Sequence, residues 1–149
     1  MAELFEGHDK GKFEIYGFSF GPDTNDAMRK RVAAAFFRFI DVRRKSDREV
    51  ASLSRSLGID IAVDLKGYTQ DTRLEIFAER CAPVQVSYLG YPGTLGTDFI
   101  DYVIADPVRG TVPSDAWINV AKTILTKYNV AVNPVMIATY QNLWPSRGA

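Results

Sequence analysis

The sequence has only one cysteine, Cys81, and only one histidine, His8. A lone cysteine cannot form an internal disulfide, and Cys81 falls in a helical pattern, so we expect a buried, inert thiol in a protein of the reducing cytoplasm. Catalysis by a serine-histidine-aspartate triad would have to depend on His8, and a site built from several histidines is excluded. Because Gly7, Asp9 and Lys10 around it are typical of an exposed turn, we expect His8 on the surface and no metal site.

The sequence also lacks an excess of charge of either sign and a long apolar run. Basic and acidic residues both number 18, so no net field attracts nucleic acid or an acidic membrane. No run reaches the roughly 18 apolar residues that a membrane span needs, and the first ten residues carry four charged side chains where a signal peptide would be apolar. With 46% apolar residues in 149, the chain is expected to form one soluble globular domain.

Predicted strands and helices alternate along residues 13–107. Segments rich in β-branched and aromatic residues predict strands at 13–20, 39–42, 59–65, 84–89 and 99–105. The alternation implies βαβ units and an α/β fold with a parallel, Rossmann-like sheet flanked by helices. Residues 59–65 are mostly apolar on both faces, which predicts a central strand of that sheet.

Three segments between these strands carry helix signals. In the first, the apolar positions expected to face inward are Met28, Val32, Ala35, Phe36 and Phe39, and Arg29, Lys30 and Arg31 are expected in water. In the second, Ser46 and Glu49 form a capping box, Val50, Leu53 and Leu57 point inward, and Gly58 ends the helix. In the third, Thr72 and Glu75 form another capping box, and the expected buried stripe before Pro83 is Leu74, Phe77, Ala78 and Cys81.

Two unusual loops follow the predicted strands that end at residues 65 and 89. Because ligands of open parallel sheets bind outside the carboxyl ends of the strands, these loops are the candidate site. The first, 66–69, combines a glycine turn with hydroxyl groups next to a helix N-terminus. The second, 90–96, has three glycines around a proline, which gives a stiff backbone that a ligand can approach closely. The residues alone leave open whether the loops line a ligand or are structural turns.

No other residue pattern assigns a chemistry. The glycines match neither the dinucleotide fingerprint nor the P-loop. Asp64 could orient a ligand, although an acid that caps nearby backbone or pairs with Lys66 is the more common case. Tyr88, Tyr91 and Tyr102 are more often packing residues than a stacking platform. No nucleophile and base stand together, so no catalytic residue is assigned.

Three motifs in these loops and strands identify a family. Asp-Leu-Lys-Gly-Tyr-Thr at 64–69, Ala-Pro-Val-Gln-Val at 82–86 and Leu-Gly-Tyr-Pro-Gly-Thr at 89–94 occur in this order. With them, residues 59–107 closely resemble the catalytic region of protein O-linked N-acetylglucosamine transferases, including their bacterial and SPINDLY-like relatives. Segments upstream extend the resemblance to about residue 3.

The resemblance implies one lobe of a two-lobed, GT-B-type glycosyltransferase. Such enzymes transfer N-acetylglucosamine from UDP-GlcNAc to serine or threonine hydroxyls of proteins, with inversion and without a metal or other cofactor. The residues that it implies at the substrate-facing edge are Gly67, Tyr68, Thr69, Gly90, Tyr91, Pro92, Gly93 and Thr94. Their expected role is positioning, because the family takes most UDP contacts, including a lysine near the phosphates, from the C-terminal lobe.

The resemblance also implies that the chain is incomplete. It begins at what should be an internal helix, so the lobe's first strand and a histidine-bearing loop are expected to be missing. We therefore expect residues 1–107 to be a partial N-terminal lobe and residues 108–149 to be a divergent tail with no pattern that fits it to the sheet. The expected function is a transferase fragment, inactive without a C-terminal lobe or partner chain; the alternative is a non-catalytic binding module. A small nucleotide-binding regulator is disfavoured because the phosphate-cradling motif is absent.

Overall fold

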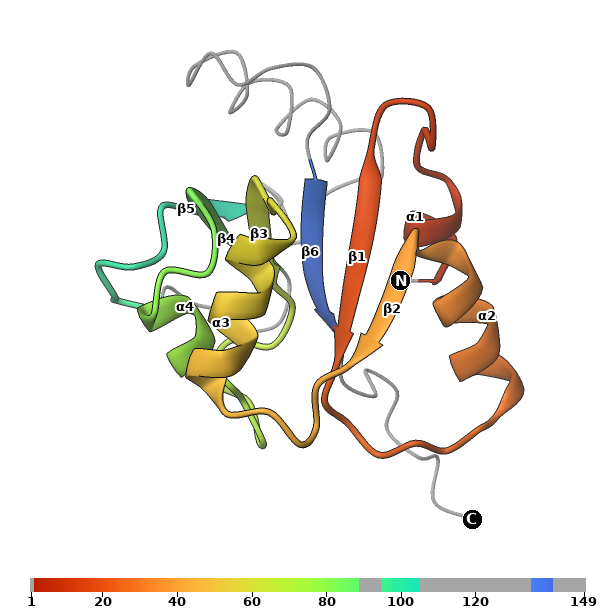
Figure 1. Cartoon of the computed structure of the whole chain (residues 1–149), viewed down its shortest axis with the longest axis horizontal. Coiled ribbons are helices and arrows are strands. Elements are labelled where there is room, and N and C mark those ends of the chain that lie inside the picture. The colour runs from red at the N-terminus through yellow and green to blue at the C-terminus, as the bar shows by residue number, and fades with distance from the viewer. Residues whose placement is uncertain (1, 89–94, 105–134, 141–149) are drawn as a thin grey trace, which may run out of the picture.

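The computed structural model describes residues 2–88, 95–104 and 135–140, with side chains for the first two ranges. At its centre is a six-stranded sheet in the order β2-β1-β6-β3-β4-β5, and all neighbouring strands are parallel (Figure 1). The strands are β1 (Glu14–Ser19), β2 (Arg38–Asp41), β3 (Ile61–Asp64), β4 (Val84–Tyr88), β5 (Tyr102–Ile104) and β6 (Val135–Tyr140). The helices are α1 (Ala2–Glu6), α2 (Ala27–Ala35), α3 (Asp47–Ser56) and α4 (Glu75–Ala78). The predicted α/β, Rossmann-like class is confirmed.

Helices cover both faces of the sheet, because successive side chains of a strand point to opposite faces. Ile15 of β1 belongs to one apolar core with Val32 of α2. Phe18, also of β1, belongs to a second core with Val50 of α3 and Phe77 of α4. Figure 1 shows α1 and α2 together on one side of the strands and α3 and α4 on the other. The fold is therefore doubly wound, as the alternation predicted.

The capping box of α3 forms as predicted. The Ser46 hydroxyl accepts the Glu49 N–H, and the Glu49 carboxylate accepts the Ser46 N–H at 2.7 Å. Val50 is fully buried, whereas Leu53 is half-buried at the rim of the same core. The helix ends before Gly58, whose φ of +69° is the left-handed conformation that glycine adopts without strain.

The prediction for α2 was wrong about which side chains face water. Met28 is 50% exposed, whereas Arg29 is only 9% exposed. Val32, Ala35 and Phe36 are buried and Lys30 and Arg31 are exposed, as predicted, so the error concerns only Met28 and Arg29 at the start of the helix. Phe39 is in strand β2 and not in the helix. Arg29 tolerates burial because polar partners surround its guanidinium, as described below.

The prediction for α4 was wrong about its start and about Ala78, whereas Leu74, Phe77 and Cys81 are buried as predicted. The helix begins at Glu75 without a side-chain cap, and the buried Thr72 hydroxyl has no hydrogen-bond partner. Ile76 is buried and Ala78 is exposed. The helix is a single turn that ends before Arg80, which has a φ of +51°. It is therefore shorter than the predicted helix.

Strand β6 lies within residues 108–149, the segment for which the sequence offered no pattern that fits it to the sheet. It pairs along its whole length with β1, from Val135 opposite Glu14 to Tyr140 opposite Ser19, and on its other side with β3. β3 therefore lies between β6 and β4, which confirms that residues 59–65 contain a central parallel strand.

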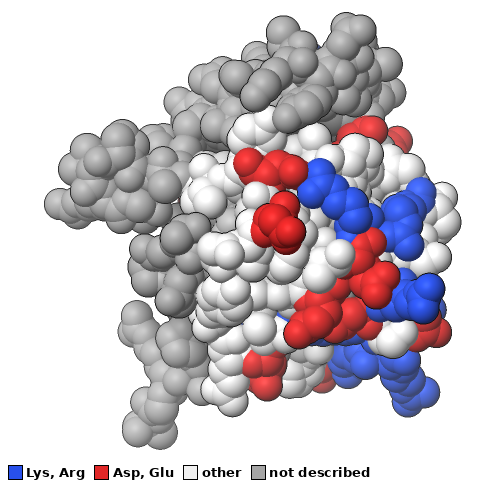
Figure 2. All heavy atoms as spheres, turned by 90° about the vertical axis from the view of Figure 1, so that its left-hand side faces the viewer, with Lys and Arg blue, Asp and Glu red and all other residues white. Residues whose placement is uncertain are grey.

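The face of the described region that is drawn in Figure 2 carries no broad area of one charge. Figure 2 shows acidic and basic side chains interspersed over one face, as equal numbers of the two kinds lead one to expect. None of the helices in the described ranges has both the length and the apolar character needed to cross a bilayer.

Candidate functional site

The candidate site lies at the carboxyl edge of the sheet. All six strands are parallel, so the segments that follow them meet at this edge. Both predicted loops, after β3 and after β4, leave the sheet here. Of the eight predicted substrate-facing residues, Gly67, Tyr68 and Thr69 are described, and residues 90–94 lie outside the described ranges.

Asp64, the last residue of β3, shapes the first loop. It is 2% exposed, and its two carboxylate oxygens accept the N–H groups of Lys66 at 2.9 Å and Gly67 at 2.8 Å. Burial raises the pKa of Asp64 from its ordinary value, against the opposing effect of these two hydrogen bonds and of the Lys66 charge. The carboxylate therefore caps its own loop, which confirms the structural interpretation of Asp64.

The first loop is compact because residues at its two ends are joined by a hydrogen bond. Gly67 has a φ of +55°, the left-handed conformation that the sharp turn requires. The Lys66 ammonium group donates to the Gln70 carbonyl, and burial lowers its pKa. Lys66 thus closes the loop. Thr69 remains exposed at its tip.

Tyr68 connects the first predicted loop to the second. Its side chain is 52% exposed, and its hydroxyl donates a hydrogen bond to the Leu95 carbonyl at 2.8 Å. Leu95 is itself 5% exposed and belongs to the core shared with α3 and α4. The bond joins loop 66–69 to Leu95, the first described residue of the second predicted loop, 90–96.

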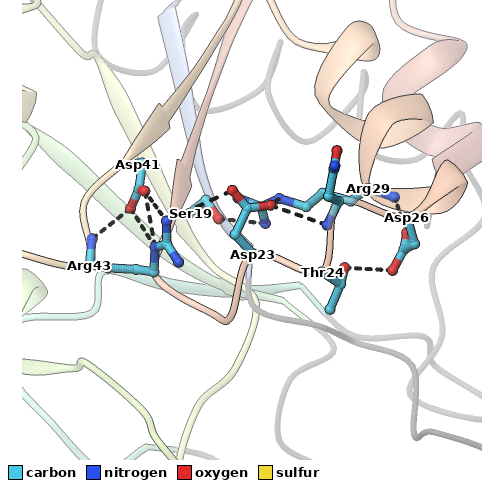
Figure 3. A network of polar contacts seen from close by, with 8 residues as sticks. Ser19, Asp23, Thr24, Asp26, Arg29, Asp41 and Arg43 are labelled. Atoms are coloured by element: carbon cyan, nitrogen blue, oxygen red, sulfur yellow. Dashed lines mark hydrogen bonds and ion pairs between the residues drawn. The ribbon is translucent and has the colours of Figure 1, made fainter.

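A polar cluster that the sequence analysis missed lies at the carboxyl ends of β1 and β2 (Figure 3). The buried Arg29 guanidinium donates to the Ser19 hydroxyl at 3.0 Å and pairs with Asp23 at 2.9 Å. Beside it, Asp41 pairs with Arg43 at 2.5 Å, and this guanidinium lowers the pKa of Asp41 to about 2. The available signal was Ser19, a polar residue that ends an apolar strand.

These charges neutralise one another, so the cluster fixes the segment between β1 and α2. Arg29 also lies 5.3 Å from the centre of the Phe39 ring, which adds a cation–π contact. Arg73 holds the neighbouring segment after β2 in a similar way. It donates to the carbonyls of Val42 and Lys45 and pairs with Asp47 at the start of α3. The carboxyl edge is thus braced by arginines on both sides of the sheet centre.

The remaining candidate residues have structural surroundings. Cys81 is 1% exposed, which confirms the predicted burial, and burial raises its pKa to about 12. Tyr88 is buried and Tyr102 packs against the same core, as expected of packing residues. His8 is half-buried rather than fully exposed, with its Nδ1 within hydrogen-bond distance of the Phe5 carbonyl. Within the described residues, no group of potential metal ligands occurs.

Known proteins resemble the chain over most of its length. A model of glycosyl transferase family 41 matches residues 1–132. The probable UDP-N-acetylglucosamine–peptide N-acetylglucosaminyltransferase SEC of Arabidopsis thaliana is 36% identical over 106 residues, which is 71% of this chain and 11% of that protein. The probable SPINDLY enzyme of Oryza sativa subsp. japonica, described by the same activity, is 44% identical over 103 residues, or 66% of this chain and 11% of that protein.

A solved structure also resembles the described fold. A mutant of the Thermobaculum terrenum O-GlcNAc transferase matches with a TM-score of 0.67 and 39% sequence identity, over 70% of this chain and 20% of that chain. The chain thus spans about a tenth of the length of these curated relatives and a fifth of the solved structure. The family match extends past residue 107, where the motifs that we could identify in the sequence end.

Proposed function

We propose, from the premise that this chain belongs to glycosyl transferase family 41, that it forms part of the N-terminal lobe of a GT-B-type protein O-linked N-acetylglucosamine transferase. The observation that carries the proposal is the hydrogen bond between the Tyr68 hydroxyl and the Leu95 carbonyl. It links the first family motif, at the carboxyl edge where open α/β folds bind their ligands, to Leu95, which directly follows the second motif in the sequence.

The reaction of the complete enzyme would move N-acetylglucosamine from UDP-GlcNAc to a serine or threonine hydroxyl. Gly67, Tyr68 and Thr69, together with residues 90–94, would line the side of the cleft that this lobe contributes. Their role would be to hold sugar and acceptor by hydrogen bonds, because the one buried carboxylate at the described edge, Asp64, is already engaged by two backbone N–H groups.

The rest of the cleft would come from a second lobe. The chain corresponds to only a fifth of the matched O-GlcNAc transferase structure, so the groups that stabilise the leaving diphosphate would come from that lobe without a metal ion. Residues 1–107 would supply the motif-bearing part of this lobe, and residues 108–149 would add β6. We place the complete enzyme in the cytoplasm, which suits a chain with one buried, reduced cysteine.

Two separate titrations of the isotope-labelled chain test this function. UDP-GlcNAc and a serine-rich acceptor peptide, each at millimolar concentration, are expected to shift the amide resonances of residues 67–69 and 95–97. Tyr68→Phe removes one hydroxyl, and the loss of one hydrogen bond, about 0.5–1.5 kcal/mol, predicts binding weaker by roughly two- to tenfold.

The matched control is Lys10→Ala, in the exposed turn before β1 at the opposite edge of the sheet. It should bind both ligands as the parent chain does. If neither ligand shifts residues 67–69, or if Lys10→Ala and Tyr68→Phe weaken binding equally, the proposed edge is not the substrate site.

A further inference from the structure

The central position of the sheet is filled by β6, the last strand in the described residues. β6 lies between β1 and β3, and these two strands do not pair with each other. In the common doubly wound order, 3-2-1-4-5-6, this position belongs to the first strand. Here β1, β2, β3, β4 and β5 occupy positions 2 to 6 in sequence, and β6 occupies position 1. The strand order is that of the common fold with its first strand replaced by its last.

Strand β6 fills the space between the facing edges of β1 and β3. Without β6 the sheet would divide into β2–β1 and β3–β4–β5, and the facing edges of β1 and β3 would have unpaired backbone groups. We call the space between these edges the central slot. Unpaired N–H and C=O groups inside a fold cost free energy comparable to that of lost hydrogen bonds. A strand in the slot satisfies both edges at once.

The slot selects its occupant mainly by backbone pairing. β6 is paired with β1 along residues 14–19 and with β3 along residues 61–63. Its sequence, Val-Met-Ile-Ala-Thr-Tyr, has no charge and suits a strand that is covered on both faces. Backbone hydrogen bonds do not require that the added strand be continuous with its neighbours, as strand addition to sheet edges by separate peptides illustrates.

We propose that the central slot is a binding site for one parallel, apolar strand, and that residues 135–140 occupy it as a ligand tethered to the lobe. The same segment supplied as a separate molecule then binds the slot whenever the tethered copy is disabled. This inference concerns the assembly of the sheet and does not depend on the proposed transferase function.

The test disables the tethered strand and supplies it in trans. Ile137, which stands opposite Tyr16 on one side and Ala62 on the other, is replaced by proline, which removes a backbone donor from a central strand. In the full-length Ile137→Pro chain, the amides of β1 and β3 should exchange with solvent at least 100-fold faster. A synthetic peptide with the sequence of residues 133–142 should restore their protection.

Binding of the dye-labelled peptide gives the second readout. The peptide should bind Ile137→Pro at least tenfold more tightly than the parent chain, whose slot is filled, and the same peptide with proline at its Ile137 position should not bind. If Ile137→Pro unfolds entirely, refolding on addition of the peptide still supports the proposal. Retained protection in the variant, no restoration by the peptide, or equal binding to both chains would overturn it.

Discussion

The side chain of Gln85 gives the most direct test of which contacts stabilise this fold. Its side chain, in the middle of strand β4, is fully buried. The amide oxygen accepts the Cys81 N–H at 2.8 Å, and the amide nitrogen donates to the carbonyls of Phe77 at 2.8 Å and Phe99 at 2.6 Å. One side chain therefore connects the end of α4 and the segment before β5 to the same strand.

Replacement by leucine keeps the approximate size of the side chain and removes all of these bonds. The Cys81 N–H then loses the Gln85 oxygen, and an unsatisfied buried group costs about 1–3 kcal/mol. The Phe77 and Phe99 carbonyls each lose one of two hydrogen bonds, worth about 0.5–1.5 kcal/mol apiece, because they also accept from the Arg80 N–H and the Arg80 guanidinium. Burial of the apolar leucine side chain offsets about 2 kcal/mol of this loss. We therefore expect Gln85→Leu to lower the free energy of unfolding by about 2 kcal/mol, with allowance for partial relaxation around the new side chain.

Urea unfolding followed by far-ultraviolet circular dichroism measures this change. The matched control is Gln70→Leu, which makes the same chemical change at an exposed position in the loop after β3 and should alter stability by no more than about 0.5 kcal/mol. If Gln85→Leu costs less than about 1 kcal/mol, or no more than the control, the amide does not clamp these segments and the reasoning fails.

Four further predictions address other parts of the molecule. Arg43 holds the folded-state pKa of Asp41 at about 2, below its unfolded value. The ion pair therefore stabilises the fold above about pH 4, and its contribution is lost as the pH falls toward 2. Asp41→Asn should flatten this part of the pH–stability curve by at most about 1 kcal/mol, because the pair is exposed. Cys81, with a pKa of about 12, should react with a thiol reagent at pH 8 only as fast as the chain opens, and rapid labelling of the folded chain would contradict this. A Cβ on Gly17 would lie 2.7 Å from the Phe39 ring, so Gly17→Ala should destabilise by about 1–3 kcal/mol in urea unfolding, and an unchanged midpoint would refute the clash. The chain alone should transfer no radiolabelled N-acetylglucosamine to a serine-rich peptide above a heat-denatured control, and turnover would show that the missing geometry is rebuilt.

The parts of the fold that the sequence predicted correctly are those set by local physics. The Ser46 and Glu49 capping box depends on residues three apart, and Gly58 ends the same helix because its own φ is positive. The strand at 61–64 was recognisable because apolar residues on both faces fit only a covered strand. At the candidate site, the glycine turn at Gly67 and the capping role of Asp64 followed from the same kind of short-range reasoning.

The parts that the sequence did not predict depend on contacts between distant segments. Arg29 is buried because its guanidinium is paired with Ser19 and Asp23, which lie outside the helix. Helical periodicity gives no information about these partners. The Tyr68–Leu95 bond spans 27 positions, so the motifs indicated two loops but not their contact. β6 pairs with β1 about 120 positions away, and only the completed sheet shows that an apolar segment near residue 137 has a partner there.

The central slot and the candidate site are mechanically linked through β3. The first site loop begins at Asp64, whose strand is paired with β4 on one side and β6 on the other. If β6 were absent, β3 would keep only one paired edge, and the carboxylate that shapes the loop would sit at an open edge of the sheet. Asp64 is buried, and its carboxylate accepts hydrogen bonds from the N–H groups of Lys66 and Gly67. Water that reached this edge would compete with the carboxylate for both N–H groups. Under the proposed function, alignment of the reactants is worth about 7–11 kcal/mol of the barrier, so a loop loosened in this way would position substrate less well even in an enzyme with both lobes. Occupation of the central slot is therefore expected to maintain the shape of loop 66–69, on which the proposed substrate site depends.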